Sequence, residues 1–280
     1  MSEINKYPLE IGRIVHKVGT SEVYTRARSE AETLDLDERD RRRRAILLAA
    51  TALKGEQGSG YLSAEGHAMN LTAHLTSFSE SIRELRTLEE SGARRKEKLP
   101  ALYKVAEFNH AVKDMIDSNP SLTFSEVSKF ILSMNQTING RVSGGPRFEH
   151  EVTQRLVGMS HEIAVEQMLG YMPGVDYQEA TVDDDVNGID LFVSIDGSPM
   201  TPIDIKASSS TAQIKKRQAI ENGYSASNIV WSHVDNKEFN GTFRIPNNLA
   251  EARSADLYND LRRAVRAQHA PVTQLVQARA

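Results

Sequence analysis

A cluster of turn-forming residues divides the sequence into two halves with different patterns. Asn139-Gly140 and Ser143-Gly144-Gly145-Pro146 combine residues that interrupt regular secondary structure. Before this cluster apolar residues recur at helical spacing, and after it short β-rich runs alternate with helical stretches. We therefore expect a domain boundary or hinge here, with a helical domain over residues 1–140 and a mixed domain over residues 147–280.

The first half is predicted to be helical throughout. Over residues 62–91 the apolar positions follow steps of three and four, which mark one face of an amphipathic helix. Pro100 is expected in the first turn of the next helix, and Thr123 with Glu126 is typical of a capping box that begins another. We expect this half to bind DNA, to form a homo-oligomer or to contact a partner.

The second half predicts the element order α-β-β-β-α-β, followed by a C-terminal helix. Such an order belongs to the α+β or α/β class, with a mixed sheet flanked by helices. The expected helices cover residues 148–169, 212–221 and about 255–268. The expected strands cover residues 177–182, 189–195, 200–207 and 228–234.

Three charged residues interrupt the apolar strands of this half. Asp190 opens one strand, while Asp204 and Lys206 alternate with isoleucines on the next and therefore project from the same face. A tight turn at Asp196-Gly197 would place residue 190 roughly opposite residues 203–204. Singly, each charged residue is most often solvated. Together they occur in strands that are expected to be buried. Burying charged side chains costs free energy unless they bind a ligand or an opposite charge.

Two carboxylates at this spacing could reach one cation. Carboxylate and carbonyl oxygens, with water, are the ligands that Mg²⁺ or Mn²⁺ prefers. Such a metal lowers the pKa of a bound water and neutralises a phosphate, and a neighbouring lysine can assist the attacking water. We therefore expect Asp190, Asp204 and the carbonyl of Ile205 to bind Mg²⁺, with Mn²⁺ able to substitute, and Lys206 to assist catalysis.

The order Glu162, then Gly188-Ile189-Asp190, then Asp204-Ile205-Lys206 resembles the PD-(D/E)xK nuclease superfamily. That group includes type II restriction enzymes, archaeal Holliday-junction resolvases and phage exonucleases. The resemblance covers about residues 147–235 and implies a restriction-endonuclease-like core that hydrolyses DNA phosphodiesters with Mg²⁺. It implies that Asp190 and Asp204 are metal ligands, Lys206 the catalytic lysine, and Glu162 the acidic residue of the first core helix. Ile189 departs from the motif, which has proline there.

Two neighbours of Glu162 have alternative interpretations. Glu166 lies one turn later on the same helix face and is the alternative acidic residue. His161 is interpreted as structural, because adjacent helix positions do not share a face.

The helix after Lys206 is the expected contact for DNA phosphates, as in similar nucleases. A solvated amphipathic helix is the alternative interpretation of the same segment. The candidate nucleic-acid-binding residues are Ser208, Gln213, Lys215, Lys216 and Arg217.

Composition limits the other possibilities. The chain has no cysteine, which excludes disulfides and cysteine-based zinc sites, and no apolar run near the ~20 residues that cross a bilayer. Its N-terminus lacks the features of a signal peptide, so a cytoplasmic location is expected. Residues 151–280 carry 12 Lys and Arg against 17 Asp and Glu, a net charge of −5. A nucleic-acid coating protein is usually basic, whereas a metal-dependent nuclease has an acidic site.

Two further hypotheses remain open. One is a catalytically inactive protein of nuclease fold that acts as a structural or nucleic-acid-binding module. The other is a helical scaffold whose second half only mimics the motif.

Overall fold

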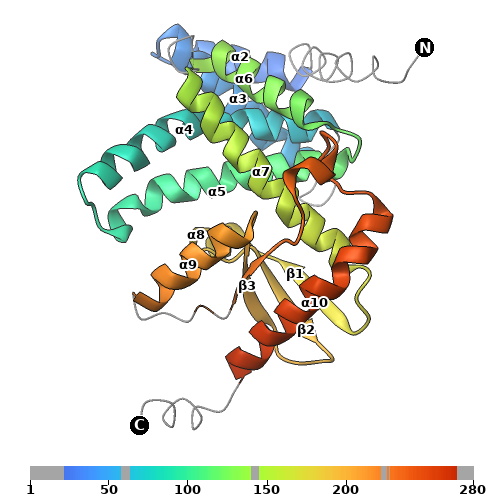
Figure 1. Cartoon of the computed structure of the whole chain (residues 1–280). Helices are drawn as coiled ribbons and strands as arrows, with labels where there is room; N and C mark the ends of the chain where they lie inside the picture. Colours follow the sequence, from blue (N-terminus) through green and yellow to red (C-terminus); the bar gives the residue numbers. More distant parts are fainter. Residues whose placement is uncertain (1–21, 58–63, 140–144, 222–225, 227, 270–280) are drawn as a thin grey trace. The chain divides into compact units, whose positions relative to one another are not determined.

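A computed structural model describes residues 22–57, 64–139, 145–221, 226 and 228–269 (Figure 1). The chain divides into two compact units, residues 1–156 and 157–280. The division falls inside helix α7 (Pro146–Leu169), later than the boundary expected at the turn cluster, of which residues 140–144 lie outside the described residues. Pro146 is suited to the first position of α7, where its missing N–H costs no helical hydrogen bond.

The first unit is helical within the described residues, as the periodicity predicts. Besides the start of α7, its elements are α2 (Glu22–Glu32), α3 (Glu38–Gln57), α4 (Ala64–Glu90), α5 (Arg95–Ser118) and α6 (Phe124–Asn139). No helix in the part of the chain that the structure describes is long and apolar enough to span a membrane.

Aromatic packing joins three helices in the core of this unit. The rings of Phe78 on α4 and Phe108 on α5 are stacked with centroids 3.8 Å apart. Phe148 of α7 meets Phe78 edge-on at 5.8 Å, and the guanidinium of Arg155 lies 5.5 Å from the same ring. Phe78 is fully buried, so the predicted apolar face of α4 is the one that forms the core.

Hydrogen bonds between side chains and backbone N–H groups cap the starts of two helices in this unit. At α6, Glu126 N–H donates to Thr123 Oγ1 (3.3 Å) and Thr123 N–H donates to the Glu126 carboxylate (2.8 Å), which confirms the predicted capping box. The prediction that Pro100 lies in the first turn of α5 is wrong. The helix begins at Arg95, where the Glu97 carboxylate accepts the N–H of Arg94 (2.6 Å) and supports an earlier start.

The second unit contains a four-stranded mixed sheet. The strands lie in the order β1-β2-β3-β4. Strand β2 is antiparallel to both β1 and β3, and β4 is parallel to β3. After α7 the elements are β1 (Val175–Glu179), α8 (Val182–Val186), β2 (Leu191–Ile195), β3 (Thr201–Lys206), α9 (Ser209–Glu221), β4 (Ile229–Trp231), the short helix η3 (Asn236–Phe239) and α10 (Asn247–His269).

This order contains the predicted α-β-β-β-α-β series, but several bounds differ and the helices α8 and η3 are additional. The first strand ends at Glu179, and the residues predicted to end it begin the extra helix α8 instead. Asp183–Asp185 belong to α8, whose start is capped reciprocally by Thr181 and Asp184. Helix α10 begins at Asn247 rather than near residue 255.

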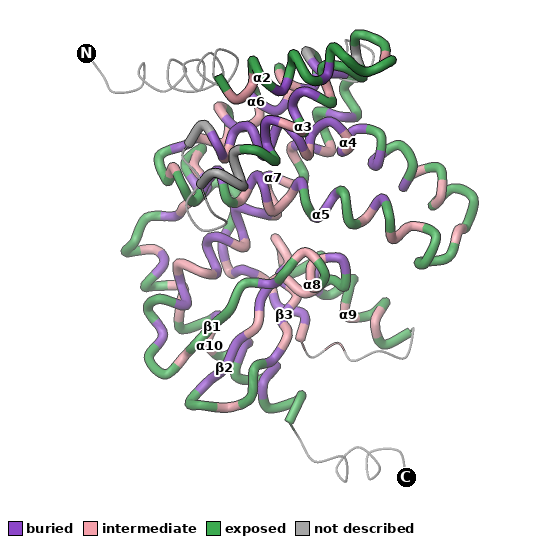
Figure 2. The backbone as a smooth tube through the Cα atoms, turned by 180° about the vertical axis from the view of Figure 1, so that it is seen from behind, coloured by how far each residue is buried: buried purple, intermediate pink, exposed green. Residues whose placement is uncertain are grey.

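One face of the sheet forms the core of the second unit, where β2 and β3 are largely buried (Figure 2). Helix α10 crosses this face (Figure 1), and α7 supplies Ala164, Val165 and Met168 to the same cluster. Ile203 and Ile205 point into it, so strand alternation turns Asp204 and Lys206 toward the opposite face.

His161 connects α7 to the segment that follows β4. Its Nδ1 lies 2.6 Å from Ser232 Oγ and its Nε2 lies 2.8 Å from Asn236 Oδ1, and the ring is buried. Burial lowers the pKa of His161, while the contact with Asn236 and the charge of Asp235 oppose that shift. The structural role expected for this histidine is confirmed.

The β2–β3 turn generates a first prediction. Asp196 and Gly197 both have positive φ, 51° and 74°, as a two-residue hairpin turn requires. A Cβ on Gly197 would meet no atom within 4 Å, so Gly197→Ala adds only left-handed backbone strain and should destabilise by about 1–2 kcal/mol. Urea unfolding measures this cost.

Gly158→Ala is the matched control. Gly158 lies within α7, and a Cβ there also meets nothing within 4 Å. Alanine at this helical position should stabilise by about 0.5–1 kcal/mol. Equal effects of the two substitutions would contradict the turn geometry.

Candidate functional site

The β2–β3 hairpin brings Asp190 and Asp204 together. Leu191 is paired with Ile203, and Asp190 N–H donates to the Ile203 carbonyl at 2.9 Å. In this antiparallel register residue 190 lies opposite residue 204. The register predicted from the Asp196-Gly197 turn is confirmed.

The Asp190 carboxyl group is held in the interior. Its Oδ2 accepts the backbone N–H of Ile205 at 2.5 Å. Burial is the largest influence and raises the pKa of Asp190 to about 7. The positive charge of Lys206 opposes this rise, while the negative charge of Asp204 adds to it. A carboxylate in this position is stabilised by a nearby cation.

Lys206 supplies a positive charge at the centre of the site. Its ammonium donates to the Asp204 carboxylate and, at 3.0 Å, to the carbonyl of Ile205. Burial alone would lower the pKa of Lys206, but Asp190 and Asp204 outweigh it, so the pKa is raised. The side chains of Lys206 and Asp204 are 20% and 16% exposed, so a ligand can reach them from solvent.

Glu162 lies within electrostatic range of this group. It is half-buried on α7, and its negative charge is among those that raise the pKa of Lys206. The alternative residue, Glu166, is half-buried one turn later on the same helix.

Asp185 is a neighbour that the sequence interpretation missed. It lies in α8, and its charge is one of the causes that raise the pKa of Asp190. The Thr181–Asp184 spacing, which is that of a capping box, was the available signal for a helix at this position.

The candidate nucleic-acid-binding residues lie on α9 or immediately before it. Ser208 precedes the helix, and its Oγ accepts the N–H of Thr211 at 3.2 Å. Gln213 and Lys216 are one turn apart and line a pocket beside β4. The other two, Lys215 and Arg217, are exposed and do not line that pocket.

The oxygens available for a divalent cation come from the end of β3 and from Asp190, directly before β2. They are the carboxylates of Asp190 and Asp204 and the carbonyl of Ile205, which suit Mg²⁺ or Mn²⁺ by chemistry. Within the described ranges, no three Asp, Glu or His side chains are grouped as a metal-binding cluster.

No protein-family model, curated protein or solved structure matches the chain. The chemical interpretation of this site therefore depends on its own residues.

The pKa of Asp190 generates the second prediction. Because the folded value, about 7, exceeds the ordinary 3.8, this group contributes most to stability at low pH, and that contribution is lost as the pH rises through about 7. In metal-free protein, Asp190→Asn should therefore gain stability relative to wild type between about pH 4 and 7. Urea unfolding in EDTA across this range measures the difference, and parallel wild-type and variant curves would contradict the burial of a titrating carboxyl.

Proposed function

We propose that this protein is a Mg²⁺-dependent nuclease that hydrolyses DNA phosphodiester bonds. One observation carries the proposal: the Asp204 carboxylate and the Ile205 carbonyl converge on one positive charge, the Lys206 ammonium, beside the buried carboxyl of Asp190. Metal-assisted phosphodiester hydrolysis needs oxygens of this kind to hold a divalent cation, with a lysine beside them.

The topology supports the same proposal. The resemblance to PD-(D/E)xK nucleases implies an α-β-β-β-α-β order with a mixed sheet flanked by helices. The second unit has this order, and its sheet combines antiparallel and parallel pairs. The candidate residues occupy the start of the second strand and the end of the third, and the helix α8 is an addition between the first two strands. We propose a restriction-endonuclease-like core on this basis.

The proposed roles follow from the positions of the groups. Asp190, Asp204 and the carbonyl of Ile205 would hold Mg²⁺, and Glu162 would act directly or through water. The metal would supply Lewis-acid activation of water and neutralise charge on the phosphate. The Asp204 carboxylate holds the Lys206 ammonium in place. Lys206 would orient the attacking water or stabilise the charge that develops on the phosphoryl oxygens.

The third prediction concerns this chemistry. Asp190→Asn and Lys206→Ala should each lower Mg²⁺-dependent DNA cleavage by about 100-fold or more, because each removes a group that acts on the transition state. Cleavage of circular and end-labelled DNA with Mg²⁺ or Mn²⁺ measures the loss, and comparison of the two substrates separates endonuclease from exonuclease activity. Lys237→Ala removes an exposed cation on η3 and should retain full activity.

An inactive module of the same fold is the competing function. The pairing of Lys206 with Asp204 favours it, since this pair neutralises its own charges. Calorimetric titration with Mn²⁺ separates the two. A nuclease should bind Mn²⁺, and Asp190→Asn should abolish this binding. In the cleavage assay, unchanged activity of both site variants would overturn the assignment of the site.

A further inference from the structure

A groove runs along the edge of the sheet in the second unit. Two pockets of about 510 and 420 Å³ adjoin each other and share Asp260 and Arg263 as lining residues. Both volumes fall in the range of roughly 300–1,000 Å³ found for ligand sites. The smaller pocket is lined by α9, β4 and α10, and the larger one by α10 and His233.

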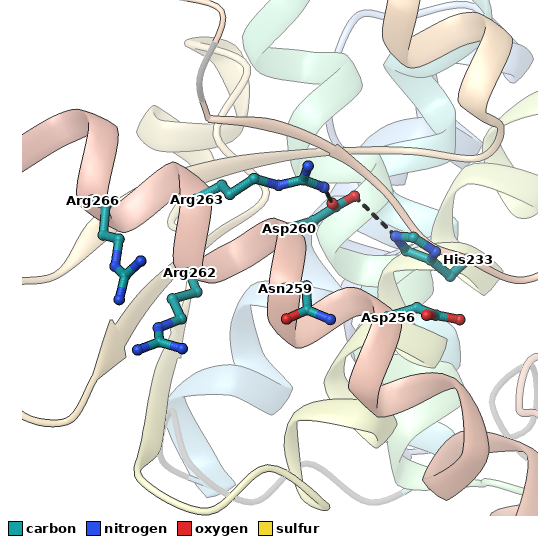
Figure 3. Close-up of a pocket in the computed structure, with 7 residues that line it drawn as sticks. All are labelled: His233, Asp256, Asn259, Asp260, Arg262, Arg263 and Arg266. Atoms are coloured by element: carbon teal, nitrogen blue, oxygen red, sulfur yellow. Dashed lines mark hydrogen bonds and ion pairs between the residues drawn. The ribbon is translucent and has the colours of Figure 1, made fainter.

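The cations of this groove are concentrated on α10. Figure 3 shows Arg262, Arg263 and Arg266 along the helix. Lys216 of α9 lines the smaller pocket together with Arg263. Two carboxylates also line the pockets. Asp260 is already engaged, because it accepts hydrogen bonds from Arg263 and from His233 Nε2 (2.9 Å). Four cations against two carboxylates make the groove locally positive within a half of the chain whose net charge is −5.

Aromatic rings line the same groove. The rings of Trp231 and His233 are 4.2 Å apart and inclined by 33°, and they line the smaller and the larger pocket respectively. His233 has a φ of 60°, an uncommon value for a residue other than glycine, which turns the chain directly after β4. Aromatic side chains in a positively charged groove are typical of proteins that bind single-stranded nucleic acid.

The groove adjoins the candidate catalytic residues. Trp231 is paired with Lys206, and the two residues therefore lie on the same face of the sheet, one strand apart. A strand of nucleic acid that stacks on Trp231 would pass about 5 Å, one strand spacing, from the backbone that carries Lys206.

We infer that this groove binds a single-stranded segment of DNA, with bases stacked on Trp231 and phosphates held by the arginines of α10. The choice of DNA, and of a strand delivered to Lys206, rests on the proposed function. A single strand is favoured over a duplex because its bases are free to reach an aromatic ring, whereas those of a duplex are already stacked on one another.

Trp231 is the single tryptophan of the chain and therefore reports binding directly. The fourth prediction is that a 12-nucleotide oligothymidylate, added to the full chain in EDTA, quenches the tryptophan fluorescence saturably, while a 12-base-pair duplex does not. Fluorescence anisotropy of the labelled oligonucleotide gives the affinity, and Trp231→Leu should lower it by roughly fivefold or more. Equal quenching by the duplex, or no quenching by the oligothymidylate, would overturn the inference.

Charge variants test the groove without disturbing the core. Arg262 and Arg266 are exposed, so Arg262→Ala and Arg266→Ala should fold normally. Each should reduce the slope of log affinity against log salt by about 0.7, the value for one phosphate contact to a single strand. Lys237→Ala removes an exposed cation outside both pockets and should leave the slope unchanged; a change equal to that of the arginine variants would show general charge attraction and overturn the groove.

The two proposals fail separately. Because binding is measured in EDTA, it needs no metal and no catalysis. Quenching by oligothymidylate without any Mg²⁺-dependent cleavage would contradict the nuclease function and still support single-strand binding in the groove. Cleavage of duplex DNA without quenching by the oligothymidylate would contradict single-strand binding in the groove and still support the nuclease function.

Discussion

The burial of the Asp190 carboxyl is the constraint on which the arrangement of the second unit depends. Burying a charged carboxylate is costly unless hydrogen bonds and an opposite charge compensate it. The Ile205 N–H and the Lys206 ammonium compensate part of this cost, and both come from the end of β3. The start of β2 is thereby tied to the end of β3, and a slip of one residue would remove the hydrogen bond and turn Asp204 into the core.

Local patterns in the sequence account for much of this arrangement. The Asp196-Gly197 dipeptide predicts a two-residue turn, and this turn brings Asp190 roughly opposite Asp204. The alternation of isoleucines with Asp204 and Lys206 predicts their common face, because strand side chains alternate regardless of what lies around them. Helices α4, α6 and α7 could be predicted for the same reason, since capping residues and apolar periodicity are local features.

The features that could not be predicted depend on contacts between distant parts of the chain or on competing local signals. Asp185 is an example, because the Thr181–Asp184 cap supports a short helix that holds Asp185 near Asp190, on the far side of the chain turn between them. The groove combines Trp231 of β4 with Arg263 of α10, which no periodicity relates. The sequence places Trp231 in an expected strand but does not show that this strand, β4, lies at the edge of the described sheet, where Trp231 is half-buried.

The proposed catalytic site is rich in negative charge, whereas the groove is rich in positive charge. Asp190, Asp204 and Glu162 concentrate negative charge, which repels a phosphodiester until a cation is bound. In a half with a net charge of −5, attraction for nucleic acid must therefore come from a separate local surface. The arginines of α10 would provide that surface in the groove that also contains Trp231, which lies one strand away from Lys206. Their interaction with phosphates would weaken steeply as salt increases. Binding and chemistry would thus depend on different ions, because monovalent salt competes in the groove while Mg²⁺ acts at the carboxylates.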